Sequence, residues 1–105
     1  MSVRSPLVRS LPCVCCEIEK MEQPNPTEEH HLNLGGYAGK KRLGDDYSVP
    51  LCGWHHRSVI QPGRTASLMD ALWGPSMART KRQFRKTYGP DDYLLKITNE
   101  RLGAM

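Results

Sequence analysis

The pattern of polar and apolar residues predicts two short strands separated by a long polar segment. Residues His30–Leu34 (HHLNL) alternate between polar and apolar side chains after the first histidine, as a half-buried strand does. Residues Ser48–Leu51 (SVPL) form a second strand, and Pro50 confines it to a sheet edge or marks its end. The segment Gly35–Asp46 is rich in glycine and charge, so we expect a connecting loop.

The N-terminal part is expected to be mostly irregular. Residues 1–12 are interpreted as an arm with one helical turn at Pro6–Arg9. Residues Cys13–Cys16 predict a tight knuckle, and the polar segment Glu17–Glu29 contains two prolines, which favours a surface loop.

After Cys52 the pattern changes to that of short helices, because capping residues, prolines and glycines recur at short intervals. The first predicted helix begins at Gly53 and is stopped by Pro62 and Gly63, and the second covers Thr65–Trp73. A third, basic helix is capped by Ser76 and runs to about Tyr88, and Pro90 and Asp91 open a last helix that ends at Gly103. Strands followed by helices in so short a chain predict a small α+β fold.

Composition indicates a modest hydrophobic core. Of the 105 residues, 38% are hydrophobic and 7% aromatic, and a chain this small often depends on a disulfide or a metal ion. We therefore expect Trp54, Trp73 and Phe84 to be core residues rather than platforms for base stacking.

Charge and the N-terminal sequence bear on the partners and the cellular location of the protein. A net charge of +4 is compatible with an acidic partner such as nucleic acid, but it serves solubility equally well. Arg4 and Arg9 interrupt any apolar run in the first eleven residues, so we predict a cytoplasmic protein with no membrane association. In that setting, four cysteines are metal ligands or free thiols rather than disulfides.

Two pairs of residues have the spacing of zinc ligands. Cys13-x-x-Cys16 and Cys52-x-x-His55 each allow two neighbours to bind one ion, and two such pairs predict a structural tetrahedral zinc site. Cys15 has a poorer bite geometry and is interpreted as a spare thiol. The alternative is that the cysteines are small buried hydrophobes, which the polar flanking residues disfavour.

All four histidines lie in two doublets, His30-His31 and His55-His56. If His55 binds zinc, then His56 points roughly 100° away around the helix and is free to face a second site. The alternative for His30 and His31 is structural, with one ring packed under the zinc knuckle.

This order of motifs resembles the HNH endonuclease family, also called the ββα-metal or His-Me finger family. The matching residues run from Leu11 to Arg57 (LPCVCC…EEHHL…DDYSVPLCGWHHR), and Gly74–Gly89 also resembles the phage and prophage branch that includes recombination-enhancement nucleases. The resemblance implies one nuclease domain over residues 1–105. Its core would be a zinc-stapled, treble-clef-like ββα-metal fold at about 11–60, with a basic helical segment at about 64–105.

The resemblance also implies roles for the histidines that the zinc does not use. His30 and His56 would hold a catalytic divalent ion, and His31 would be the general base that takes a proton from the attacking water. Cation stabilisation of the phosphate and of the leaving 3′ oxygen, together with an imidazole base, suits phosphodiester hydrolysis.

Two departures from the family pattern bear on the metal. No asparagine stands near Asp45–Tyr47, where the family's middle residue falls, and Ile60 stands where many relatives have a third metal-binding histidine. An ion held by two histidines must be completed by water and phosphate, which favours magnesium or manganese.

Clusters of cations are the candidates for contacts with DNA phosphates, which make binding independent of sequence and sensitive to salt. The alternative for the helical cluster is a solvated basic face. The candidates are Lys40, Lys41, Arg42, Arg57, Arg79, Lys81, Arg82, Arg85 and Lys86.

The sequence thus predicts a metal-dependent DNA endonuclease of phage or prophage recombination, with structural zinc and catalytic magnesium or manganese. Its partner would be DNA. The alternatives are a zinc-knuckle DNA-binding adaptor without catalysis, and a partner-dependent nuclease that cuts only when a recombinase presents the DNA. The oligomeric state is not predicted.

Overall fold

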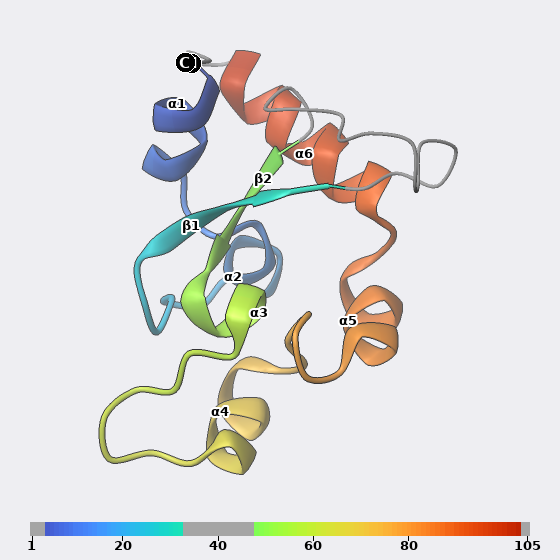
Figure 1. The fold of residues 1–105 in the computed structure, drawn as a ribbon. Helices are drawn as coiled ribbons and strands as arrows, with labels where there is room; N and C mark the ends of the chain where they lie inside the picture. Colours follow the sequence, from blue (N-terminus) through green and yellow to red (C-terminus); the bar gives the residue numbers. More distant parts are fainter. Residues whose placement is uncertain (1–3, 33–47, 104–105) are drawn as a thin grey trace.

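The computed structural model describes residues 4–32 and 48–103, which form a two-stranded sheet with helices before and after it (Figure 1). The elements in order are α1 (Arg4–Ser10), α2 (Val14–Glu19), β1 (Thr27–His31), β2 (Ser48–Cys52), α3 (Gly53–Arg57), α4 (Ala66–Trp73), α5 (Lys81–Tyr88) and α6 (Asp91–Gly103). None of the helices in these two ranges is long and apolar enough to cross a membrane.

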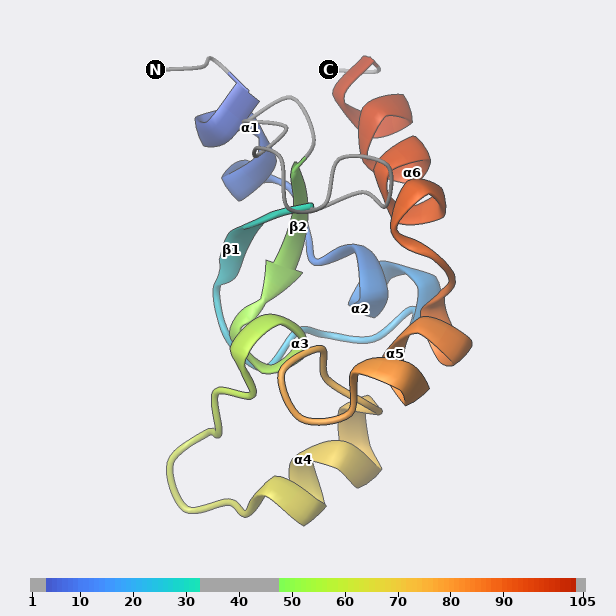
Figure 2. The ribbon, with the colours of Figure 1, turned by 45° about the vertical axis from the view of Figure 1, so that its right-hand side comes forward.

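The sheet pairs β1 and β2 in antiparallel register, with His30 opposite Val49 and His31 opposite Ser48. Every residue of β2 is buried, whereas every residue of β1 is only partly buried. Helices α1, α2, α3 and α6 all contact β2, which therefore runs through the middle of the packed layers (Figure 2). Because β1 lies at the outside of this arrangement, its side chains remain accessible for chemistry.

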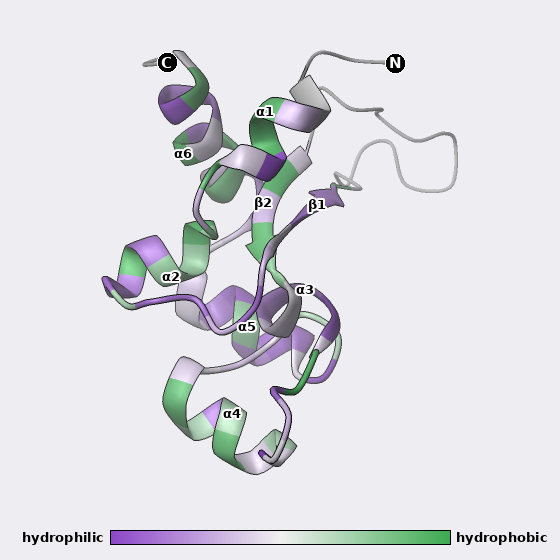
Figure 3. Ribbon diagram, turned by 90° about the vertical axis from the view of Figure 1, so that its left-hand side faces the viewer, coloured by the Kyte–Doolittle hydropathy of each residue, from purple (hydrophilic) through white to green (hydrophobic). Residues whose placement is uncertain are grey.

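Buried residues from most of the described elements form one hydrophobic cluster. Trp54 and Phe84 are fully buried, as predicted, while Trp73 is only partly buried and its indole N–H donates to the carbonyl of Glu22. The amphipathic α5 buries Phe84 and Tyr88 and is otherwise hydrophilic (Figure 3). This helix thereby attaches a strongly basic surface to the core.

The short helix α3 is held at both ends by contacts that fix its position. Its first turn is capped by Asn25, whose side-chain oxygen accepts a hydrogen bond from the N–H of Trp54 at 2.6 Å. It ends at Ser58, which adopts a left-handed conformation with φ 61°. The helix is therefore only five residues long, and both His55 and His56 lie within it.

The predicted α+β class and the helices after Cys52 are confirmed, but several boundaries were wrong. Residues assigned to the loop Glu17–Glu29 contribute the end of α2 and the first three residues of β1. The predicted strand His30–Leu34 begins earlier, at Thr27, because Pro26 rather than Glu29 precedes the paired residues. Residues 33–34 of that prediction, and the predicted loop Gly35–Asp46, lie outside the described residues.

Two further boundaries have consequences for the site. Helix α5 begins at Lys81 rather than at Ser76, whose hydroxyl instead accepts a hydrogen bond from the N–H of Arg79 in a preceding turn. Helix α3 ends before Val59, so Ile60 is not one turn further along the same helix and is 42% exposed. Position 60 therefore does not continue α3, because the left-handed Ser58 redirects the chain.

Candidate functional site

The four predicted zinc ligands converge from three parts of the chain. Cys13 and Cys16 stand at the start and in the first turn of α2, Cys52 ends β2, and His55 lies in α3. All four are buried, and their ligand atoms lie within 4.8 Å of one another. In the described ranges, no other group of three or more cysteine, histidine or acidic residues has ligand atoms this close together.

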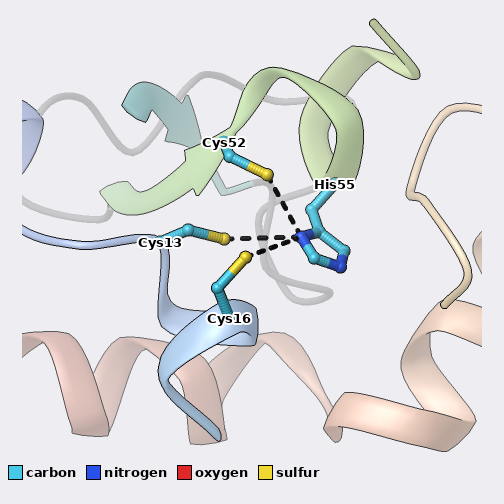
Figure 4. A group of neighbouring side chains, drawn as sticks. All are labelled: Cys13, Cys16, Cys52 and His55. Atoms are coloured by element: carbon cyan, nitrogen blue, oxygen red, sulfur yellow. Dashed lines mark hydrogen bonds between the residues drawn. The ribbon is translucent and has the colours of Figure 1, made fainter. Parts of the chain in front are cut away.

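The geometry of this cluster fits a tetrahedral zinc site (Figure 4). The sulfurs of Cys13, Cys16 and Cys52 lie 3.5, 3.6 and 3.2 Å from Nδ1 of His55. Bonds of about 2.3 Å to sulfur and about 2.0 Å to nitrogen give tetrahedral sulfur–nitrogen edges of roughly 3.5 Å. The cluster can therefore bind zinc without rearrangement of its ligands.

The Nε2 edge of the His55 ring is held by a hydrogen bond. Its Nε2 lies 2.8 Å from the carbonyl oxygen of Trp73, which also accepts a hydrogen bond from the Tyr88 hydroxyl at 2.9 Å. A carbonyl can only accept, so Nε2 carries the proton and the lone pair of Nδ1 faces the thiols. Such outer contacts orient metal-binding histidines and fix their tautomer.

Protonation within the cluster also favours a cation. Burial acts to raise the pKa of the Cys13 thiol, but hydrogen bonds with Cys15, Cys16, Cys52 and His55 lower it well below its usual value. Burial acts to lower the pKa of His55, but hydrogen bonds with Cys13 and Cys52 raise it to about 10. Without an ion, negative charge therefore rests on Cys13, while hydrogen bonds with Cys13 and Cys52, together with burial, raise the pKa of the Cys16 thiol. A bound divalent cation would stabilise the thiolates and take the place of the proton between Cys13 and His55.

Cys15 is buried beside this cluster but does not belong to it. Burial and the neighbouring Cys13 both raise the pKa of its thiol, so it stays protonated and unreactive. Its position agrees with the interpretation of Cys15 as a spare thiol.

Outside this cluster, His30 of β1 and His56 of α3 lie next to each other. The rings of His30 and His56 lie 4.9 Å apart between centroids, at an interplanar angle of 60°. Two imidazoles that bind one ion at about 2.1 Å place their ring centres roughly 5 Å apart. Two residues separated by 25 positions in the chain are thus placed as a pair of ligands would be.

Glu28 completes this arrangement and was missed by the sequence analysis. Its Oε1 lies 2.9 Å from Nδ1 of His56, and the carboxylate also accepts hydrogen bonds from Arg57. The hydrogen bond with Arg57 is the largest cause that lowers the pKa of Glu28, with a further contribution from His56. An ionised Glu28 accepts a hydrogen bond from Nδ1–H of His56, which leaves Nε2 free to bind a metal.

A strand periodicity in the sequence would have placed Glu28 on the same face as His30, although its contact with His56 depends on the fold. Residues two apart on a strand share a face, so Glu28 and His30 both face α3. The incorrect loop assignment of Glu17–Glu29 hid this relation.

His30 is held in its neutral form. Burial and the neighbouring His56 lower the pKa of His30 to about 4, and the charge of Asp91 acts in the opposite direction. A neutral imidazole retains a lone pair for a metal ion, so the ring is ready to serve as a ligand near neutral pH.

His31 lies next to His30 on the strand, and its Nε2 is 3.8 Å from Oε2 of Glu29. Adjacent strand residues point to opposite faces, so the two rings diverge from the backbone. Both nevertheless line one cavity of about 270 Å³, together with Met77, Lys81, Arg85 and Asp91. His31 is thus accessible to the same bound molecule as His30.

The predicted DNA-binding cations divide into separate groups. Lys81 and Arg85 line the cavity beside His30, whereas Arg79, Arg82 and Lys86 line a neighbouring shallow depression to which Lys81 also contributes. Each of these five residues is exposed. The basic helix therefore places cations both at the histidines and along an adjacent path.

The other predicted cations do not all share this position. The side chain of Arg57 is 62% exposed and forms an ion pair with Glu28, so its charge is already paired. Lys40, Lys41 and Arg42, like Asp45–Tyr47, lie outside the described residues.

Comparison with known proteins gives one match. Residues 3–103 match the sequence model of a family described as "recombination enhancement, RecA-dependent nuclease". No curated protein and no solved structure matches the chain.

Proposed function

Because the chain belongs to the family of recombination-enhancement, RecA-dependent nucleases, we propose that it is an HNH-type endonuclease that hydrolyses DNA phosphodiester bonds with a divalent ion. The family makes it a nuclease, an enzyme that acts on DNA. The observation that supports the finer assignment is the contact between His30 and His56, 4.9 Å apart and oriented by Glu28. We place its activity in phage or prophage recombination.

The structural role is assigned to zinc on Cys13, Cys16, Cys52 and His55. These ligands join α2 to the junction of β2 and α3. Because His56 follows His55 directly, fixing one imidazole fixes the helix that presents the other. The resulting core corresponds to a treble-clef-like ββα-metal fold within one nuclease domain.

The catalytic role is assigned to the residues around β1. His30 and His56 would hold magnesium or manganese, which would supply positive charge to the phosphate and to the leaving 3′ oxygen. His31 takes the proton of the attacking water, and Lys81 lies in the same cavity, where its ammonium can pair with a phosphate oxygen. The exposed cations Arg79, Arg82 and Lys86 hold the neighbouring backbone of the DNA.

The test is a cleavage assay on plasmid and single-stranded DNA with magnesium or manganese, with and without RecA filaments. We expect cleavage by the wild-type protein that depends on RecA, as the family's name states. His31→Ala should lower the rate by about 10²- to 10⁴-fold, the usual contribution of a general base, while DNA binding is retained.

Two outcomes would contradict this assignment in different ways. Cleavage that persists in His31→Ala would show that the base is another residue. DNA binding without cleavage under any of these conditions would favour the non-catalytic zinc-knuckle adaptor. Zinc content and circular dichroism of each variant establish that it is folded.

A further inference from the structure

The cavity of about 270 Å³ beside His30 and His31 has a feature that the proposed mechanism does not use. Its wall includes Asp91, the first residue of α6, together with Lys81 and Arg85 from α5. One proposed ion ligand (His30), the proposed base (His31) and a carboxylate thus line the same cavity, although the carboxylate comes from about 60 positions further along the chain.

One oxygen of Asp91 is buried and unsatisfied. The side chain is 12% exposed, and Oδ2 accepts a hydrogen bond from Nη2 of Arg85 at 3.1 Å. Oδ1 is inaccessible to solvent and makes no hydrogen bond within the described part of the chain. Buried carboxylate oxygens are rarely left without a partner, and an ion or an ordered water is the usual explanation.

The helix start does not account for this burial. A carboxylate in the first turn of α6 is stabilised by the helix dipole, but the neighbouring Asp92 provides the same charge from an exposed position. What distinguishes Asp91 is that its side chain is largely buried and lines the cavity of His30 and His31.

We propose that Asp91 is the third protein group of the divalent-ion site, with its carboxylate accepting a hydrogen bond from a water bound to the ion on His30 and His56. This inference rests on the proposed function. Contact through water is favoured because His30, His56 and Asp91 do not bring three ligand atoms within 4.8 Å of one another in the described structure. Magnesium and manganese sites commonly retain several waters.

Asp91 would supply the third group that a histidine supplies in relatives at the position of Ile60. A relative with a third histidine would complete its ion shell from the region after α3, which here turns away at Ser58. Here the third group comes instead from α6, which follows the basic helix α5. Asp91 also holds Arg85 at the same cavity, so one carboxylate connects the ion to the DNA-binding cations.

The experiment is a titration of zinc-loaded full-length protein with Mn²⁺, followed by electron paramagnetic resonance, with thermal unfolding measured in parallel. Asp91→Asn should weaken Mn²⁺ binding by about 10- to 100-fold, the usual loss when an outer contact of a metal site is removed. Asp92→Asn is the matched control, since it removes the same charge from the next residue, and it should bind Mn²⁺ as the wild type does.

A purely structural role for Asp91 is tested by Arg85→Ala, which breaks the ion pair but leaves the carboxylate. The proposal expects Mn²⁺ binding that is unchanged or tighter, because a competing cation has been removed. Weakening equal to that of Asp91→Asn would show that the ion pair alone matters and would overturn the proposal.

His30→Ala separates this inference from the proposed function. If His30→Ala abolishes Mn²⁺ binding while Asp91→Asn binds normally, the inference about Asp91 is wrong and the ion site stands. If His30→Ala binds Mn²⁺ as the wild type does, the proposed ion site is wrong, and the role of Asp91 falls with it.

Discussion

At the scale of single residues, the two adjacent histidines of α3 face different surroundings. His55 turns Nδ1 to three thiols, while His56 turns its ring to His30 and Glu28. About 100° of helical rotation separates neighbouring side chains, so one turn of helix can serve two sites. Each imidazole is oriented by an oxygen acceptor, a carbonyl for His55 and a carboxylate for His56.

The carboxylate of Glu28 leads to a prediction about metal affinity. Glu28→Gln replaces an obligate acceptor with an amide that can present either a donor or an acceptor to His56, so the tautomer is no longer fixed. We expect Mn²⁺ binding to weaken by about 10-fold or more, measured by calorimetric titration of the zinc-loaded protein.

Two variants control for the other contacts of Glu28. Glu100→Gln changes an exposed carboxylate on α6 and should leave Mn²⁺ binding unaltered. Arg57→Ala removes the ion pair but keeps the acceptor for His56, so a loss as large as that of Glu28→Gln would refute the tautomer argument.

At the scale of elements, the positions of α4 and α5 are set by the residues that join them to the zinc cluster. Gly74 ends α4 with φ 83° and ψ −172°, a region of backbone conformation that is essentially restricted to glycine. The carbonyl before it accepts hydrogen bonds from both His55 and Tyr88. The connection between α4 and α5 therefore also fixes the carbonyl group that orients His55, a proposed zinc ligand.

Gly74→Ala should be strongly destabilising for two reasons. A Cβ at this position would lie 2.7 Å from the Tyr88 hydroxyl, and the backbone conformation costs an alanine about 1–3 kcal/mol. We expect the free energy of unfolding to fall by at least that amount in urea denaturation of the zinc-loaded protein.

Gly63→Ala provides the comparison, because Gly63 also has a positive φ, 81°, but has open space around its Cβ position. It should lose less stability than Gly74→Ala and should keep zinc equally well. Equal losses from the two variants would mean that the approach of Tyr88 contributes nothing.

The basic helix α5 is predicted to separate binding from catalysis along its length. Lys81 lines both the histidine cavity and the neighbouring depression, whereas Arg82 lines the depression and not the cavity. Lys81→Ala should therefore reduce the cleavage rate more than DNA affinity. Arg82→Ala should weaken binding and reduce the slope of log affinity against log salt concentration by about one.

Salt-dependent binding and single-turnover cleavage of both variants test this separation. Identical effects on rate and on affinity in the two variants would show instead that α5 acts as one undifferentiated basic surface.

At the scale of the whole molecule, the zinc cluster joins segments that have few other reasons to stay together. Helix α2 has six residues, α3 has five, and the sheet in the described ranges has two strands. Such short helices and a two-stranded sheet are only marginally stable in isolation. We therefore expect metal binding and folding to be coupled.

Removal of zinc should consequently unfold the protein. The wild type should contain one tightly held zinc per chain and lose its near-ultraviolet circular dichroism in chelator. Cys52→Ala should lack zinc and be unfolded, whereas Cys15→Ala, which changes a buried cysteine outside the cluster, should retain it. Apo-protein that keeps its native spectrum would contradict a structural role for the metal.

The sequence by itself determined the features that depend on local spacing. Two C-x-x-C or C-x-x-H pairs predict a shared ion because a short turn places both side chains on one side, and the structure does bring these four residues together. Capping residues and glycines likewise located most of the helices after Cys52, because helix ends are decided by neighbouring residues.

Only the tertiary structure decided which distant groups meet. The register of β1 against β2 put Glu28 beside His56, and the packing of α6 put Asp91 into the His30 cavity. Neither contact follows from spacing, because the segments between them can close in many ways and the chosen one depends on burial of the whole core. Short motifs therefore identified the histidines, but only the tertiary structure showed which acidic residues lie near them.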